Sequence, residues 1–296
     1  MTSSRTDHDG PSAGPTPGRP TTSDRVRQVS VCVGAVLAVA GSAVGSGALG
    51  GTPIAQASDG ALSATATLVA PGSGAFSIWS VIYVGLLASA VVQALPGRAA
   101  DPAHRRGGWW LVASMLLNAA WILAAQQGLL GLTVPVIAVL VAVVGRLALL
   151  LVAQRPQRRL DTAVLGATAG LYLGWVLVAT VANVAAALAT SSIDLSVLSP
   201  TAWAGVVVAV AAVIASLTSV RLSGLAWTGL GVAAASAWGL AGIAVGRATE
   251  GPSSSVTTVL AAVAATVVLA VGVVAGLRSE ASRGRTGRST GQQTGR

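Results

Sequence analysis

The sequence predicts an all-α integral membrane protein with eight transmembrane helices, and three observations lead to this prediction. Of its 296 residues, 53% are hydrophobic and only 9% are charged, a composition typical of membrane proteins. Eight apolar stretches approach the length of about 20 residues that a helix needs to cross a bilayer. Arginines lie almost entirely between and beyond these stretches. The predicted spans are roughly 29–49, 75–95, 109–126, 132–153, 162–189, 200–219, 223–246 and 256–277.

The arginines also predict how the chain crosses the membrane. The sequence contains 18 basic residues, all of them arginine. With the N-terminus in the cytoplasm, only Arg247 lies on the opposite side and only Arg146 lies inside a span. Basic residues favour the cytoplasmic side during insertion, so we expect a multi-pass protein of the cytoplasmic membrane with both termini inside. This topology accounts for a pI of about 11.6 without a nucleic-acid partner.

The first span has an alternative interpretation. Its apolar run follows Arg25 and Arg27 and is itself followed by Ala55-Gln56-Ala57, as in a signal peptide with a small-residue cleavage site. The run of about 21 residues is longer than the roughly 7–15 residues of a signal-peptide core, which favours a retained helix. Cys32 lies in this span and is the only cysteine, so an intramolecular disulfide is excluded.

Composition divides the chain into four parts. Residues 1–28 are expected to form a disordered cytoplasmic tail, and residues 278–296 a basic disordered tail, because both are rich in small polar residues. The five spans within 29–190 form one bundle that carries most of the aromatic side chains. The three spans within 191–277 form an additional segment made mostly of Ala, Val, Leu and Gly. The long loop at 50–74 should face outside, where such loops are often lids or are disordered.

Acidic residues are absent from the predicted spans. Every Asp and Glu falls in a tail or loop, and both His8 and His104 lie outside the spans. Ion-coupled carriers and intramembrane hydrolases usually need ionisable groups at mid-membrane, so both classes are disfavoured. No metal site and no covalent cofactor are expected. For Arg146, snorkelling to the cytoplasmic surface is favoured over pairing with a ligand carboxylate.

Aromatic and amide side chains gather on one face of three predicted helices. A helical residue advances by about 100°, so residues three or four apart share a face. Stripes of this kind, covering arcs of about 60–80°, lie in the second, third and fifth spans. Their members are Phe76, Trp79 and Tyr83, then Trp110, Ser114, Asn118 and Trp121, then Tyr172, Trp175, Ala179 and Asn183.

Two interpretations of these stripes stay open. If they converge, they line a cavity with flat apolar walls and a few hydrogen-bonding groups, which suits a planar and mostly apolar ligand. Structural packing is the alternative, since Trp and Tyr anchor helices at membrane interfaces and Asn bridges neighbouring helices. Trp79 and Trp110 lie near span ends, where anchoring applies, whereas Asn118, Trp175 and Asn183 lie deeper.

The opposite face of the fifth span carries small residues. Gly166, Gly170 and Gly174 recur every four residues, so they lie on one side of the helix. Small residues at this spacing predict that a second helix approaches closely. A homodimer through such faces is an alternative, although these spacings are common in glycine-rich chains.

The three stripes resemble the motifs of the translocator protein family, also called tryptophan-rich sensory proteins. In that family, as here, the motifs follow one another on the second, third and fifth helices. The resemblance covers about residues 29–190. The matching motifs are Phe76-x-x-Trp79-x-x-x-Tyr83, Asn118-x-x-Trp121, and Tyr172-x-x-Trp175 followed by Ala179-Thr180 and Asn183.

The resemblance implies a five-helix bundle whose cavity is closed by the loop between the first two helices, here residues 50–74. Family members bind porphyrins and sterol-like molecules, and some bacterial members influence tetrapyrrole metabolism or promote porphyrin breakdown. The implied partners are therefore a small hydrophobic ligand, such as a porphyrin or a lipid, and the membrane lipids. Trp79 and Trp175 would flank the ligand. The cavity would be lined by Tyr83, Asn118, Ala179 and Asn183.

The chain departs from the family pattern in several places. Gly170 replaces the usual proline before the fifth-helix tyrosine, and Pro71-Gly72-Ser73-Gly74 replaces an aromatic and Pro-Pro signature. The loop at 50–74 has no Trp or Tyr, and the last three spans are not part of the usual family plan. We therefore expect a divergent member that acts as a ligand-binding sensor or regulator. The alternatives are a transporter without ion coupling and a membrane scaffold without a small ligand, while an enzyme is implied by resemblance only.

Overall fold

The computed structural model describes residues 19–47, 52–193 and 196–293, with side chains described up to residue 282. Within these residues the fold is entirely helical. Eight helices are long and apolar enough to cross a membrane, as the sequence predicts. They are α1 Thr22–Gly45, α2 Ile78–Ala94, α3 Pro102–Gln126, α4 Leu130–Gln154, α5 Arg159–Ala189, α6 Pro200–Leu222, α7 Ala226–Thr249 and α8 Ser255–Gln293. Two short 3₁₀ helices, η1 Ser58–Gly60 and η2 Ser73–Ser77, lie between α1 and α2.

Polar caps start two helices earlier than the apolar runs suggest. α1 begins at Thr22, inside the predicted tail, because Thr21 and Asp24 form a reciprocal capping box. α3 begins at Pro102, seven residues before the predicted span, with the Asp101 side chain accepting from the Ala103 amide at 2.8 Å. A helix needs hydrophobic residues only where it meets lipid or the protein core, so hydropathy alone places these starts too late.

The C-terminal end also differs from the prediction. α8 continues to Gln293, through most of the residues expected to form an irregular tail. Arg278, Glu280 and Ala281 are good helix formers, and a polar helix leaving the bundle can be solvated without a packing partner. The predicted disorder of residues 1–18 and 294–296 lies outside the described residues.

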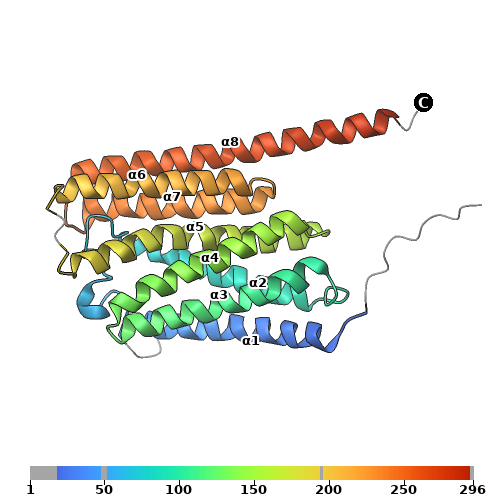
Figure 1. The fold of residues 1–296 in the computed structure, drawn as a ribbon, viewed down its shortest axis with the longest axis horizontal. Coiled ribbons are helices and arrows are strands. Elements are labelled where there is room, and N and C mark those ends of the chain that lie inside the picture. The colour runs from blue at the N-terminus through green and yellow to red at the C-terminus, as the bar shows by residue number, and fades with distance from the viewer. Residues whose placement is uncertain (1–18, 48–51, 194–195, 294–296) are drawn as a thin grey trace, which may run out of the picture.

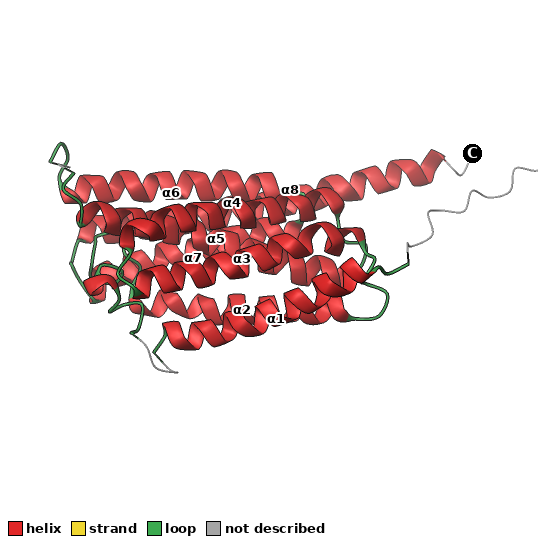
Figure 2. Cartoon of the chain, turned by 60° about the horizontal axis from the view of Figure 1, so that its bottom comes forward, coloured by secondary structure: helices red, strands yellow, loops and turns green. Residues whose placement is uncertain are grey.

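The helices run roughly along one direction and form a single bundle (Figure 1). α1 to α5 pack around one another, and α7 contacts α5, α6 and α8. Figure 1 and the turned view in Figure 2 both place α8 on the side of the bundle away from α1. α1 begins and α8 ends at the same end of the bundle. The loop from α1 to α2 lies at the other end, and its described part, residues 52–72, is called the lid below.

The glycine face of α5 meets α7 of the same chain. A Cβ atom added at Gly170 or Gly174 would overlap a carbonyl oxygen of α7, that of Thr228 or Val232 respectively. On the other side, a Cβ at Gly231 would lie 2.9 Å from the main-chain nitrogen of Leu171. The two backbones are therefore in direct contact, as the glycine spacing predicts. The last three helices are consequently joined to the first five through a tight helix pair.

Two hydrophobic cores meet along this pair. One core lies among α1 to α5 and includes Val232 and Ala235 of α7. The other lies among α6, α7 and α8 and includes Val178 of α5 and Val69 of the lid. Since α5 and α7 each contribute to both cores, the first five helices and the last three share a continuous hydrophobic interior.

Candidate functional site

A cavity of about 430 Å³ lies beneath the lid. It is bounded by the last turns of α1, by the lid, and by α2, α3, α4 and α5. Its volume falls within the range of about 300–1,000 Å³ that is usual for small-molecule sites. Seven of the eleven residues of the three predicted stripes line it: Phe76, Trp79, Tyr83, Asn118, Trp121, Trp175 and Ala179. The three predicted stripes thus converge, as the first interpretation of the sequence requires.

The aromatic residues form one continuous wall. Trp79 stacks on Tyr83 with ring centroids 5.5 Å apart and planes 24° apart. Trp175 meets Trp79 edge to face at 6.4 Å and 82°, and it meets Phe76 at 5.6 Å and 79°. Because the two indoles touch each other, they make a corner of the cavity. In this arrangement a planar ligand can stack on one indole and meet the edge of the other.

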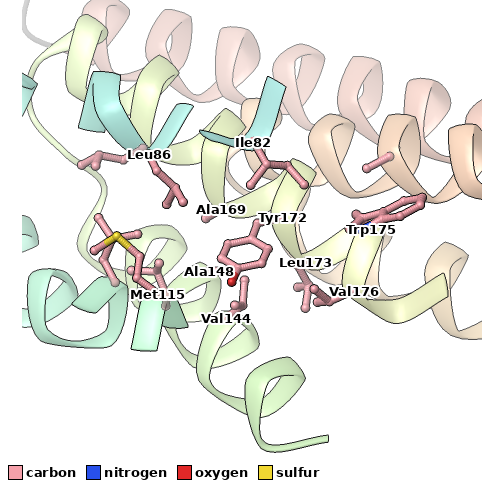
Figure 3. Packing of buried hydrophobic residues seen from close by; sticks show 14 of the residues in the cluster. Ile82, Leu86, Met115, Val144, Ala148, Ala169, Tyr172, Leu173, Trp175 and Val176 are labelled. Carbon is pink, nitrogen blue, oxygen red and sulfur yellow. The ribbon is translucent and has the colours of Figure 1, made fainter. Parts of the chain in front are cut away.

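Tyr172 does not line the cavity. Like Trp175 it is buried, but it lies one turn earlier on α5, on the side away from the lid, and only Trp175 lines the cavity. Figure 3 shows the ring enclosed by residues of the hydrophobic core, among them Ile82 and Ala169. Its hydroxyl donates to the Ser114 carbonyl at 3.1 Å. Its ring packs edge to face against Trp79, with ring centroids 5.8 Å apart. Tyr172 therefore packs behind the aromatic wall and helps to position Trp79.

Asn183 lies at the edge of the site, in a smaller recess of about 50 Å³ shared with Trp121, Trp175 and Ala179. Its amide oxygen accepts from the Trp121 indole at 3.0 Å, and its amide nitrogen donates to the Thr133 hydroxyl at 2.8 Å. The residue thus joins α3, α4 and α5. In this structure Asn183 acts as a helix bridge, which is the packing alternative left open by the sequence.

The second amide side chain, that of Asn118, lines the cavity. Asn118 is 4% exposed, lines the cavity and donates to the Tyr83 hydroxyl at 3.2 Å. This bond fixes the orientation of the Tyr83 ring on which Trp79 stacks. The amide and phenol groups therefore supply the polar contacts of an otherwise apolar site.

We expect Asn183→Leu to lower the free energy of unfolding by about 1–2 kcal/mol, because it leaves the Trp121 indole without its acceptor and removes the hydrogen bond that the Thr133 hydroxyl accepts. SDS titration in mixed micelles measures this change. Thr180→Val is the matched control, since its hydroxyl donates only to Val176 in its own helix. Equal stability of the two variants would contradict the bridging role.

Several lining residues carry no signal in the sequence. They are aliphatic or small, and such residues look the same whether they face lipid, another helix or a cavity. The unpredicted members include Ser42 and Gly45 of α1, Ile54 and Leu62 of the lid, and Ile137 and Leu140 of α4. Arg146 is exposed on α4 and does not line the cavity, which fits the snorkelling interpretation.

The sequence matches a known protein family over most of its length. A family model described as TSPO-like protein matches residues 31–274. The chain belongs to the TSPO-like protein family. Curated proteins and solved structures gave no match. This TSPO-like protein is a multi-pass membrane protein by its family and its eight apolar helices.

The match corrects one expectation. We expected the resemblance to end near residue 190, with the last three helices outside the family plan. The matched region instead runs through α6, α7 and the first half of α8. The tight α5–α7 contact explains why the last helices belong with the first five in this TSPO-like protein: α5 could not bury its glycine face without α7.

Proposed function

We propose that this TSPO-like protein binds a planar, mainly apolar ligand of the porphyrin class beneath the lid, and that it acts as a sensor or regulator of that ligand. The observation that carries the proposal is the aromatic corner of Trp79 and Trp175 inside a cavity of about 430 Å³. Aromatic faces bind planar rings through stacking, with an energy of roughly 0.5–1.5 kcal/mol per pair beyond burial.

The polar groups of the site suit such a ligand. Asn118 and Tyr83 place an amide and a phenol beside the aromatic wall. Ser73 and Ser80 add hydroxyls near the N-terminal end of α2. A few hydrogen-bonding groups within an apolar site orient a ligand that is apolar across its ring and polar at its edge. A porphyrin has this character, since its apolar macrocycle carries polar substituents at the rim.

The end of the bundle opposite the lid favours a binding protein over a transporter. Leu86, Met115 and Val144 are each at most 3% exposed and fill the bundle on the side of the cavity away from the lid. Beyond them the helix ends are joined by ion pairs. Asp161 pairs with Arg98 at 2.9 Å and contacts His104 at 3.1 Å. A transporter would have to open this packed and ion-paired layer, whereas a binding protein would keep it closed.

We expect Trp79→Leu to weaken the binding of protoporphyrin IX about tenfold, because the variant loses roughly 1.4 kcal/mol of stacking on the cavity wall. The shift of the porphyrin absorption band on titration into detergent-solubilised protein measures the affinity. Trp109→Leu is the matched control, since Trp109 is 45% exposed and does not line the cavity. Native protein that gives no saturable shift, or equal binding by both variants, would refute the proposal.

A further inference from the structure

The lid end of α7 lies in main-chain contact with the end of the lid. The Gly72 amide donates to the Gly242 carbonyl at 2.9 Å. A Cβ atom added at Gly246 would lie 2.8 Å from the Gly72 nitrogen, so no side chain fits between the two backbones. The glycines of α7 therefore dock the segment that leads from the lid into α2.

Arg247 extends this contact into the lid itself. Its side chain is 1% exposed, although it belongs to the last turn of α7. Of the two terminal guanidinium nitrogens, Nη1 donates to the Thr67 carbonyl at 2.7 Å and Nη2 donates to the Ala64 carbonyl. Hydrogen bonds from a charged donor are roughly twice as strong as those between neutral groups. A buried arginine thus holds two main-chain positions of the lid, and Ala64 itself lines the cavity.

Glu250 makes a second polar contact close by. Both of its carboxylate oxygens lie 3.1 Å from the Ser73 amide nitrogen, and one accepts from the Ser73 hydroxyl at 3.0 Å. Trp238, three turns earlier on α7, donates from its indole to the Ala75 carbonyl at 2.8 Å. α7 therefore holds the chain from residue 64 to residue 75.

The first half of the lid has different supports. The Ser58 hydroxyl donates to the Ala125 carbonyl of α3 at 2.9 Å. Gln126 donates to the Thr52 carbonyl at 3.1 Å, and the Ile54 amide donates to the Gly45 carbonyl of α1 at 3.0 Å. Residues 52–58 are thus fixed by α1 and α3. Loosening the α7 contacts should free only the second half of the lid.

We propose that α7 positions the lid over the cavity, with Arg247 and Glu250 as the positioning residues, and that these contacts set the rate at which a ligand leaves. The effect on ligand release rests on the proposed function, whereas the positioning of the lid does not. The last three helices therefore have a role at the cavity although they contribute no lining residue to it.

Hydrogen exchange of the full-length protein without ligand tests the positioning role. We expect Arg247→Gln to speed exchange of the amides of residues 64–72 about tenfold, since two charge-assisted hydrogen bonds are weakened. Residues 52–58 should exchange as in the native protein. Arg247→Lys retains a charged donor and should give an intermediate rate. Arg221→Gln is the matched control, because Arg221 is exposed in the last turn of α6 and makes no contact with the lid.

A second variant keeps the test valid if Arg247→Gln does not fold. Glu250 is exposed, so Glu250→Ala should fold normally while losing the contacts to Ser73. We expect a smaller increase in exchange, about threefold, over the same residues. Native exchange rates in the lid of a folded Arg247 variant would overturn the proposal; if no Arg247 variant folds, native rates in Glu250→Ala would overturn it.

The release of protoporphyrin IX tests the consequence for the ligand. We expect Arg247→Gln to raise the dissociation rate about tenfold, as measured by stopped-flow competition, with a smaller change in the association rate. Faster lid exchange with unchanged release would overturn the control of release. If the native protein does not bind porphyrin and the lid still exchanges faster in the variants, the proposed function fails and the positioning role of α7 stands.

Discussion

Replacing Gly170 with alanine is expected to destabilise this protein by about 3 kcal/mol, the upper end of the range for overpacked cores. The added Cβ atom would overlap the Thr228 carbonyl oxygen and would lie 3.1 Å from the Cα atom of Gly231. Both neighbours are main-chain atoms, so no side-chain rotation can relieve the contact. The helices α5 and α7 would have to move apart along the whole interface. SDS titration in mixed micelles measures the loss.

Gly145→Ala is the matched control for this substitution. Gly145 lies in the interior of α4, and a Cβ atom there would have no neighbour within 4 Å. Alanine is favoured over glycine inside a helix by about 0.5–1 kcal/mol, so this variant should be slightly more stable than the native protein. Similar stability of the two variants would mean that α5 and α7 are not in close contact.

The sequence was sufficient to predict the spans and the aromatic site. Hydropathy and arginine placement predict eight helices because each depends only on local composition. Helical periodicity predicts which residues share one face of each helix, because that depends on a single helix. Trp79, Asn118 and Trp175 lie on such faces, and all three line the cavity. The depth of a side chain is harder to predict. Tyr172 shares a face with Trp175 and is equally buried, but only Trp175 lines the cavity.

What the sequence could not predict depends on contacts between distant segments. The glycines at 166, 170 and 174 predict a close helix without indicating which helix it is. From the sequence, Arg247 is predicted to be the only arginine on the outer side of the membrane. Nothing in its local sequence indicates that it is buried against the carbonyls of residues 64 and 67. The role of α7 at the lid therefore required the three-dimensional arrangement.

Filling the cavity should weaken ligand binding without unfolding the protein. Ala179 lines both the main cavity and the smaller recess, so the indole of Ala179→Trp would occupy space that a ligand needs. We expect the affinity for protoporphyrin IX to fall at least tenfold, by roughly 1.4 kcal/mol or more. Stability should be unchanged or higher, because filling a cavity adds packing contacts. Porphyrin titration and SDS titration measure the two quantities.

The opposite responses of binding and stability separate a site effect from general misfolding. Ala138→Trp is the matched control, because Ala138 is exposed on α4 and does not line the cavity. It should leave both porphyrin affinity and stability close to native values. If Ala179→Trp binds porphyrin as well as Ala138→Trp does, the ligand lies elsewhere on the protein. If Ala179→Trp loses binding and retains stability, the space beneath the lid is the binding site, since no hydrogen-bonding group has been removed.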